Sequence, residues 1–190
     1  QVMNKQWRHG SGGRQKAVLL DRDGTLLDQT GYLGDPDGIA FYPGVPGALK
    51  RLQEEGFLLL VITNQSGVGR CYFDEETAIA VNIRMAKLLM DEGVFLAGIY
   101  YCPHHPDAGC RCRKPGTFMG ERAMRDFHVS PERSWVVGDT ERDVVMGTGM
   151  GIRSILLDTG KEVEGVVPDS VIAARDLSEA TEHILAEEVS

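Results

Sequence analysis

The sequence contains no apolar run close to the roughly 20 residues that a membrane-spanning helix needs. The segment from Gln1 to Arg14 also lacks the apolar core of a signal peptide. We therefore expect a cytoplasmic protein with no membrane partner. An excess of positive charge is missing too, because the formal net charge of the chain is −8. Proteins that bind nucleic acid usually carry a basic surface, so we expect no nucleic-acid partner.

Cysteine is scarce: the chain has four, and three of them lie together at positions 102, 110 and 112. In a reducing compartment we expect this cluster to bind a metal. The alternative, a disulfide, needs an oxidising compartment and leaves one of the three cysteines over. Cys71 stands apart and is expected to be a plain thiol.

Neither an internal repeat nor a second domain is visible in the sequence. We expect a flexible leader over residues 1–15 and a single, monomeric domain over residues 16–190. Short apolar runs alternate with helical patterns, which predicts an α/β fold with a doubly wound parallel sheet. Strands are predicted at 17–20, 57–62, 98–101, 134–137 and 154–157 and near Val171, and helices at 45–55, from Asp74 to Gly93, at 118–127 and 141–150 and from Ser178.

The first apolar run leads directly into Asp21 and Asp23, which are followed by Gly24. Two carboxylates spaced one residue apart on a strand point to the same side. Such a pair is unfavourable unless a cation lies between the carboxylates or one of them is protonated. Mg²⁺ together with a phosphate substrate would satisfy both carboxylates. Taken alone, the stretch could also be an ordinary exit from a strand into a turn, where Asp and Gly are common.

Polar residues follow the ends of other predicted strands as well. Thr63, the loop from Cys102 to Lys114, and Asp139 each come after a different strand. Parallel strands place their carboxyl ends at one edge of the sheet. We therefore expect these distant segments to converge with Asp21 on one site.

The loop after the third strand carries a potential zinc site. Its three cysteines, together with one of the adjacent histidines at 104 and 105, fit a closed tetrahedral site of the Cys₃His kind. Because the protein would fill all four positions, the zinc is expected to be structural. It would order a short polar loop and fix Arg113 and Lys114 beside the site predicted at the edge of the sheet.

These motifs resemble, in order and spacing, the four-motif signature of the haloacid dehalogenase superfamily. Within it, the chain is most similar to the small phosphatases of D-glycero-D-manno-heptose 1,7-bisphosphate, with histidinol-phosphate phosphatases as a sister group. The resemblance covers about Ala17 to Asp158 and implies a Rossmann-like fold of haloacid dehalogenase type without a large cap domain. The motifs that carry it are Asp21-Arg22-Asp23-Gly24-Thr25, Gly31-Tyr32-Leu33, residues 63–67, residues 100–106, Cys110-Arg111-Cys112-Arg113-Lys114-Pro115 and Gly138-Asp139 with Asp143.

The resemblance implies a Mg²⁺-dependent phosphatase that works through an aspartyl-phosphate intermediate. Asp21 would be the nucleophile, and Asp23 the general acid and then the general base. Thr63 and Lys114 would stabilise the transferring phosphoryl group. The family pattern places Mg²⁺ on Asp21, Asp23 and Asp139, with Asp143 holding a metal-bound water, and zinc on Cys102, His104, Cys110 and Cys112. The expected substrate-binding residues are Arg22, Tyr32, Asn64, Gln65, Ser66 and Arg113.

For the substrate we expect a phosphorylated small molecule, specifically a sugar bisphosphate that loses its 7-phosphate in the supply of heptose for the lipopolysaccharide core. Arg113 suits a second phosphate, because a guanidinium binds phosphate bidentately. Ser66 stands where histidinol-phosphate phosphatases carry Asp. Two alternatives stay open: a histidinol-phosphate phosphatase, and a phosphate-binding protein without catalysis on the same fold.

Overall fold

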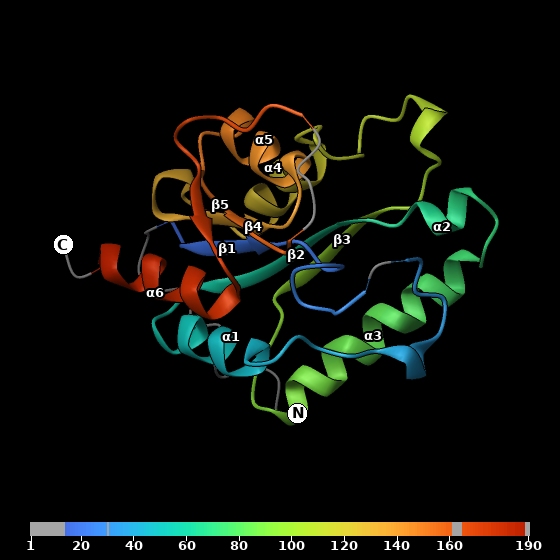
Figure 1. The fold of residues 1–190 in the computed structure, drawn as a ribbon, viewed down its shortest axis with the longest axis horizontal. Coiled ribbons are helices and arrows are strands. Elements are labelled where there is room, and N and C mark those ends of the chain that lie inside the picture. The colour runs from blue at the N-terminus through green and yellow to red at the C-terminus, as the bar shows by residue number, and fades with distance from the viewer. Residues whose placement is uncertain (1–13, 30, 161–164, 189–190) are drawn as a thin grey trace.

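Six strands form one parallel sheet in the computed structural model, which describes residues 14–29, 31–160 and 165–188 (Figure 1). Their order in the sheet is β3-β2-β1-β4-β5-β6. The chain therefore builds outward from β1 to β3 and then crosses to the other side of β1, which confirms the doubly wound prediction. The strands are β1 (Ala17–Leu20), β2 (Leu58–Asn64), β3 (Gly98–Cys102), β4 (Trp135–Gly138), β5 (Arg153–Leu157) and β6 (Ile172–Ala174).

Helices cover both faces of the sheet (Figure 1). One face packs against α1 (Val45–Glu54), α3 (Glu75–Asp91) and α6 (Leu177–Glu188), and the other against α4 (Phe118–Asp126) and α5 (Glu141–Gly149). The shorter elements are α2 (Ser66–Gly69), η1 (Pro36–Gly38), η2 (Pro106–Ala108) and η3 (Pro131–Arg133). No helix among these described segments is long and apolar enough to cross a membrane.

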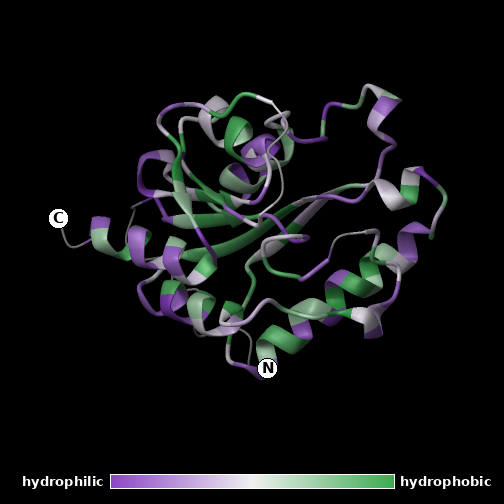
Figure 2. Cartoon of the chain, viewed as in Figure 1, coloured by the Kyte–Doolittle hydropathy of each residue, from purple (hydrophilic) through white to green (hydrophobic). Residues whose placement is uncertain are grey.

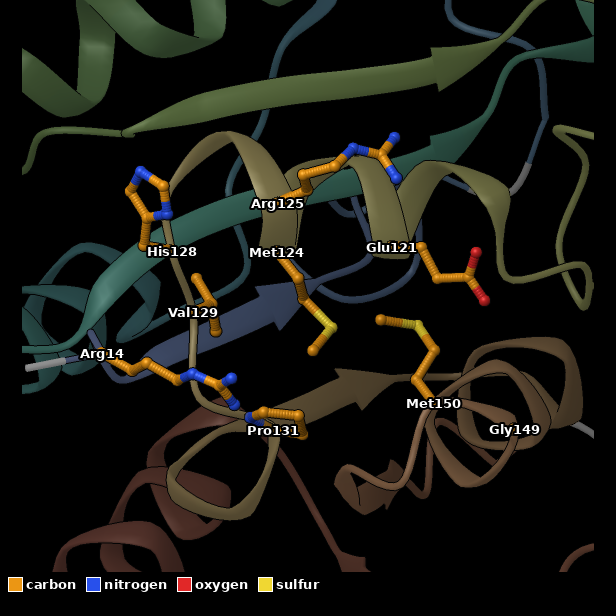
Figure 3. A pocket seen from close by; sticks show the side chains of 9 residues that line it. All are labelled: Arg14, Glu121, Met124, Arg125, His128, Val129, Pro131, Gly149 and Met150. Atoms are coloured by element: carbon orange, nitrogen blue, oxygen red, sulfur yellow. The ribbon is translucent and has the colours of Figure 1, made fainter.

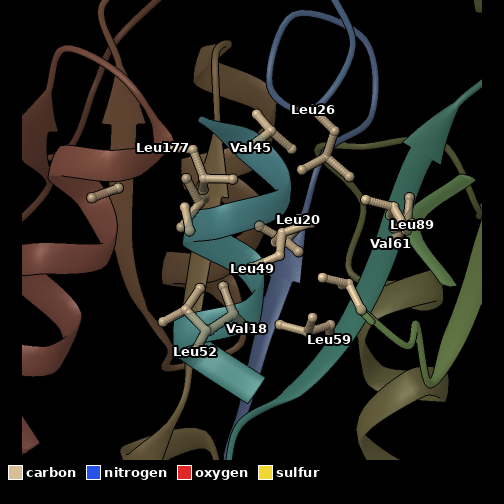
Figure 4. Packing of buried hydrophobic residues seen from close by; sticks show 14 of the residues in the cluster. Val18, Leu20, Leu26, Val45, Leu49, Leu52, Leu59, Val61, Leu89 and Leu177 are labelled. Atoms are coloured by element: carbon tan, nitrogen blue, oxygen red, sulfur yellow. The ribbon is translucent and has the colours of Figure 1, made fainter. Parts of the chain in front are cut away.

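The continuous apolar runs of the strands follow from this three-layer arrangement. In β1, Val18 and Leu20 pack toward Leu49 of α1, whereas Ala17 and Leu19 belong to the cluster on the opposite face. Because alternate residues of a strand point to opposite faces, a strand covered on both sides must be apolar throughout. Figure 4 shows the first cluster between α1 and the sheet, and Figure 2 shows apolar strands between helices of mixed polarity.

Helix ends are set by local sequence signals. The carboxylate of Asp74 accepts a hydrogen bond from the backbone of Thr77 at 2.8 Å and caps α3, as the sequence predicts. Thr140 and Asp143 form a capping box at the start of α5. This second cap brings the first turn of α5 up to the carboxyl end of β4.

The structure differs from the sequence prediction in several strand and helix bounds and in one short helix. Strand β2 extends to Asn64, because Thr63 and Asn64 pair with β3. The short helix α2 was not predicted, since four residues are too few to show a period. Residues 1–13 of the predicted leader lie outside the described residues. Gln15, at the end of the predicted leader, forms backbone hydrogen bonds with His128 and Ser130.

Candidate active site

A cavity of about 330 Å³ lies at the carboxyl ends of β1, β2 and β4, where the chain crosses from one half of the sheet to the other. Ligands in open α/β sheets bind at this kind of position. The structure thus brings together segments that are far apart in the sequence, as the order of the strands predicts. The predicted site residues that line the cavity are Asp21, Asp23, Tyr32, Thr63, Asn64, Gln65, Ser66, Arg113, Lys114 and Asp139.

Lys114 is the central cation of this cavity. Its side chain is only 3 % exposed, and Nζ donates to Asp21 Oδ1 at 2.8 Å and to Asp143 Oδ1 at 2.6 Å. Nζ also donates to the carbonyl oxygen of Ile62 in β2. Burial disfavours the ammonium, but the charges of Asp143 and Asp21 outweigh it and raise the pKa of Lys114. Lys114 therefore remains charged and ties β1, β2 and α5 together.

Asp143 is buried in the first turn of α5, and both of its oxygens are engaged. Oδ1 accepts from Lys114, while Oδ2 accepts from the backbone nitrogen of Thr140 at 3.1 Å and from its hydroxyl at 2.8 Å. Burial raises the pKa of Asp143, although the charge of Lys114 opposes this shift. The capping box thus gives Asp143 a fixed orientation beside Asp21.

Asp21, Asp139 and Asp143 form an acidic cluster that fits a magnesium ion. Each offers a carboxylate oxygen, and these oxygens lie within 4.8 Å of one another. Oxygen donors of this kind are the ones that Mg²⁺ prefers. Two glycines make room for the cluster: a Cβ at Gly24 would lie 2.0 Å from Asp139 Oδ2, and a Cβ at Gly138 would lie 2.3 Å from Asp143 Cγ. The backbone is thus shaped to let the carboxylates approach one another.

Asp23 faces the cavity with a carboxylate that is held on both oxygens. Nε of Arg22 donates to Oδ1 and Nη2 to Oδ2, each at 3.0 Å, and Gln65 Nε2 donates to Oδ2 at 2.7 Å. The side chain of Asp23 is 23 % exposed, so it remains accessible from the cavity. The carboxylate of Asp23 is therefore held in one orientation and remains accessible to a ligand in the cavity.

Arg22 does not line the cavity, which differs from the substrate contact that the sequence analysis gave it. Its side chain is fully buried, because Nη1 donates to Asn82 of α3 and Nη2 to Gln65 Oε1, both at 2.8 Å. Gln65 in turn donates to the hydroxyl of Thr63 at 2.8 Å. Arg22 and Gln65 thus form a layer beneath the cavity that orients Asp23 and Thr63.

Asn64 connects the end of β2 to the backbone of Lys114. Its Oδ1 accepts from the Lys114 nitrogen at 3.0 Å, and its Nδ2 donates to the Lys114 carbonyl at 3.2 Å. This reciprocal pair occupies the amide of Asn64. The predicted substrate contact of Asn64 is therefore accompanied by a positioning contact that the sequence did not reveal.

The structure brings Cys102, His104, Cys110 and Cys112 together in the loop after β3, with ligand atoms within 4.8 Å of one another. Cys102 Sγ lies 3.1 Å from Cys112 Sγ and 3.5 Å from Cys110 Sγ, and the four cysteines of the chain are free thiols. His105 is turned away, because its Nδ1 accepts from the backbone of Asp107. Three sulfurs and one imidazole nitrogen match the donor set of a closed zinc site.

The thiols of this cluster differ in acidity. Burial raises the pKa of Cys102 to about 12. Burial also opposes ionisation of Cys110, but hydrogen bonds from Cys102 and the Arg113 backbone prevail and lower the pKa of Cys110 to about 7. Cys110 therefore supplies a thiolate near neutral pH, the form in which cysteine binds metal.

Two arginines that the sequence analysis missed lie beside the site. Arg142, in the first turn of α5, lines the catalytic cavity, and Arg70 lies in an adjoining one together with Arg113. Their positions carry a signal that was not used, because both follow closely on the carboxyl end of a strand.

A separate cavity of about 530 Å³ lies at the opposite edge of the sheet, between α4, residues 128–131 and the end of α5. Figure 3 shows Met124 and Met150 extending into it. None of the predicted site residues lines this cavity. The chemistry-bearing residues are thus gathered at the carboxyl edge.

Comparison with known proteins gives a consistent result. The HAD-hydrolase-like family model matches residues 111–180. D-glycero-beta-D-manno-heptose-1,7-bisphosphate 7-phosphatase of Haemophilus ducreyi is 42% identical over 157 residues, which cover 78% of this chain and 86% of the relative. The protein of the same name from Pasteurella multocida is 40% identical, with 78% and 85% covered. The crystal structure of D,D-heptose 1.7-bisphosphate phosphatase from B. bronchiseptica, complexed with magnesium and phosphate, has a TM-score of 0.84 and 32% identity and covers 90% of this chain and 99% of that one.

Proposed function

This chain belongs to the D-glycero-D-manno-heptose 1,7-bisphosphate 7-phosphatase family of haloacid dehalogenase-like phosphoric monoester hydrolases, and we propose that it removes the 7-phosphate from that sugar bisphosphate. The observation that carries the proposal is the position of Asp21. Its carboxylate lies at the carboxyl end of the central strand, hydrogen-bonded to the buried cation Lys114 and facing a cavity. A carboxylate held in this way is a nucleophile that needs no further activation at neutral pH.

In the first step, a carboxylate oxygen of Asp21 attacks the phosphorus, and the bond from phosphorus to the sugar oxygen breaks. Asp23 gives its proton to the leaving oxygen. In the second step, Asp23 takes a proton from water, which attacks the aspartyl phosphate and releases inorganic phosphate. The contacts of Arg22 and Gln65 hold Asp23 in place and favour its ionised form, the form in which it takes the proton from water in the second step.

Lys114 is proposed to supply positive charge, and Thr63 a hydrogen-bond donor, to the transferring phosphoryl oxygens. Nζ of Lys114 already lies between two carboxylates, and the hydroxyl of Thr63 is oriented by Gln65. Donors that are fixed before the reaction stabilise developing negative charge without reorganisation. Asn64 is a positioning residue in this scheme, because it holds the backbone of Lys114.

The acidic cluster is the proposed magnesium site, with Asp21 and Asp139 as ligands together with the backbone carbonyl of Asp23. Asp143 is expected to hold a metal-bound water. Bound Mg²⁺ would offset the repulsion between the carboxylate of Asp21 and an anionic phosphoryl group. The matched donor set and the space left by Gly24 and Gly138 support this assignment.

The Cys₃His cluster is the proposed structural zinc site. The loop it would fix continues directly into Arg113 and Lys114, and Lys114 is anchored to Asn64 at its other side. With four protein ligands the ion has no open position, so its contribution is to order the loop.

For the substrate, Arg113 supports a bisphosphate over histidinol phosphate. It lines both the catalytic cavity and the adjoining one, and its Nη1 atom is buried without a hydrogen-bond partner in the described structure. A second phosphate would satisfy this donor bidentately. The amine of histidinol phosphate would instead be repelled by it.

Two measurements test the proposal. Heptose 1,7-bisphosphate, histidinol phosphate and an aryl phosphate are compared by phosphate release, and we expect the highest kcat/KM for the bisphosphate. In parallel, Asp21→Asn is expected to abolish turnover of all three with its fold intact, whereas Asp37→Asn on exposed η1 keeps wild-type rates. Better hydrolysis of histidinol phosphate would refute the substrate, and residual turnover in Asp21→Asn would refute the covalent mechanism.

We also propose that the enzyme acts in the cytoplasm as a monomer, as a single domain over residues 16–190 after a leader, without nucleic-acid or membrane partners. Its product would enter the synthesis of the lipopolysaccharide core. The net charge of −8 supports the absence of nucleic acid. The mass of the purified protein in solution tests the oligomeric state.

A further inference from the structure

A second cavity, of about 670 Å³, adjoins the catalytic cavity and shares several of its lining residues, among them Tyr32, Arg113 and Arg142. Four of the side chains that line this second cavity are cationic, and none is a carboxylate. The chain as a whole carries a net charge of −8. A region lined by one sign of charge, opposite to that of the whole protein, favours a ligand of the other sign.

Three of these four cations have donors available for a ligand. Lys114 is engaged by Asp21 and Asp143, so it belongs to the reacting end. Arg70 and Arg113 each have a buried nitrogen, Nε and Nη1 respectively, without a hydrogen-bond partner in the described structure. Arg142 pairs through Nε with Glu141 at 3.2 Å, and 38 % of its side chain is exposed toward solvent. A buried donor that is left unpaired is unfavourable, so an anion placed here would relieve it.

We propose that Arg70 and Arg142 join Arg113 to bind the non-reacting phosphate of the substrate and so set the preference for bisphosphates over monophosphates. The inference rests on the proposed function, because it needs a phosphate at Asp21 to define the other end. The three guanidinium groups come from the residue after α2, from the proposed zinc loop and from α5, and all three line this cavity. Guanidinium groups bind phosphate oxygens in a fixed bidentate geometry, which a lysine cannot reproduce.

Tyr32 holds Arg70 at the boundary between the two cavities. The guanidinium carbon of Arg70 lies 5.7 Å from the centre of the Tyr32 ring, within the range of a cation–π contact. Tyr32 in turn packs edge-on against Tyr72, with ring centres 4.9 Å apart. Since Tyr32 lines both cavities, it lies where the carbon chain between two phosphates would pass.

The test compares heptose 1,7-bisphosphate with heptose 7-phosphate, which differ only in the phosphate that does not react. The variants are Arg142→Gln, Arg70→Gln and Arg142→Lys, and the control is Arg111→Gln. Arg111 is an exposed arginine of the same loop that lines neither cavity. For each folded variant, kcat and KM are measured with both substrates. Thermal unfolding verifies that each variant is folded, and Arg142, whose side chain is 38 % exposed, supplies the decisive variant if Arg70→Gln is unstable.

We expect the ratio of kcat/KM for bisphosphate over monophosphate to fall about tenfold in Arg142→Gln and in Arg70→Gln, mainly through KM, as for the loss of a charge-assisted hydrogen bond. Arg142→Lys should recover part of the ratio, and Arg111→Gln should retain the wild-type ratio. An unchanged ratio, or an equal loss with both substrates, would overturn the inference while leaving the proposed function in place. A wild-type enzyme that hydrolyses neither substrate would overturn the proposed function as well.

Discussion

Replacing Lys114 by Met tests whether the buried cation holds the acidic cluster together. Lys114 is 3 % exposed and Asp143 2 %, so the substitution leaves carboxylates without their counter-charge in a site that water barely reaches. Met has a similar volume, so the change is electrostatic rather than a cavity. Removing one partner of a buried ion pair typically lowers the free energy of unfolding by about 3–5 kcal/mol, and we expect a loss in this range near pH 8.

The loss should shrink as the pH falls. Burial already raises the pKa of Asp143, and the charge of Lys114 opposes that shift, so the variant should have a still higher pKa at Asp143. The folded variant then binds a proton more readily than the unfolded chain, whose Asp143 has an ordinary pKa. Stability therefore increases as the pH falls below the folded pKa of Asp143 and continues to increase down to the unfolded pKa, by at most about 1.4 kcal/mol per pH unit for one proton.

The assay is urea unfolding followed by tryptophan fluorescence, near pH 8 and near pH 5.5, without added Mg²⁺ because a cation at the cluster would offset the loss. Lys50→Met removes an exposed lysine of α1 and should change stability by less than about 0.5 kcal/mol. A loss below about 1 kcal/mol for Lys114→Met at both pH values would show that the carboxylates do not depend on this ammonium.

Three further predictions follow from named contacts. Cys110→Ser should lower zinc content, melting temperature and activity together, whereas Asp139→Asn should lower activity alone and Cys71→Ser, at an exposed thiol, should change none of the three. Zinc is expected at about one per chain, and full activity in a zinc-free preparation of unchanged melting temperature would contradict the structural role. Gly24→Ala places a Cβ 2.0 Å from Asp139 Oδ2, so activity should fall at least about tenfold and recover partly at high Mg²⁺. The control is Gly109→Ala, which has the same left-handed backbone but open space around its Cβ. This control should lower the free energy of unfolding by only about 1 kcal/mol. Burial and a hydrogen bond to Asp126 raise the pKa of Tyr100 to about 12, so its contribution to stability is complete below pH 10 and lost between about pH 10 and 12. Burial also raises the pKa of Tyr101 to about 12, so ultraviolet titration should show late ionisation of both phenols. Tyr100→Phe should reduce the amplitude of this late ionisation, and an unreduced amplitude would assign it elsewhere.

Most of the fold was predictable because it follows from local patterns. Runs such as Leu58–Ile62 are apolar at every position, and this composition already indicates a strand covered on both faces. Glycines and caps mark the helix ends, as Asp74 does for α3. What the sequence did not indicate depends on neighbours in space: β2 reaches Asn64 only because β3 pairs with it there.

The candidate site was predictable once the strands were predicted, because parallel strands place their carboxyl ends at one edge of the sheet. The limits appear at Arg22 and Asn64. An arginine is almost never fully buried unless it is paired, and the partners of Arg22 come from Gln65 and Asn82, far along the chain. The pairing of Asn64 with the Lys114 backbone joins residues separated by 50 positions. Arg142 and Arg70 each follow the carboxyl end of a strand, and this signal in their positions was not used.

The reciprocal hydrogen bonds between Asn64 and Lys114 have a consequence for how the proposed zinc ion and a bound phosphate would affect each other. They make the backbone of Lys114 a unit shared by the proposed zinc loop and the end of β2 beside the cavity. Ordering this unit for one ligand leaves less to be ordered for the other. Linkage of this kind is reciprocal, so whatever free energy bound phosphate gains from a zinc-loaded loop, zinc gains equally from bound phosphate. The phosphate level around the enzyme would then help to determine how tightly the proposed site holds zinc.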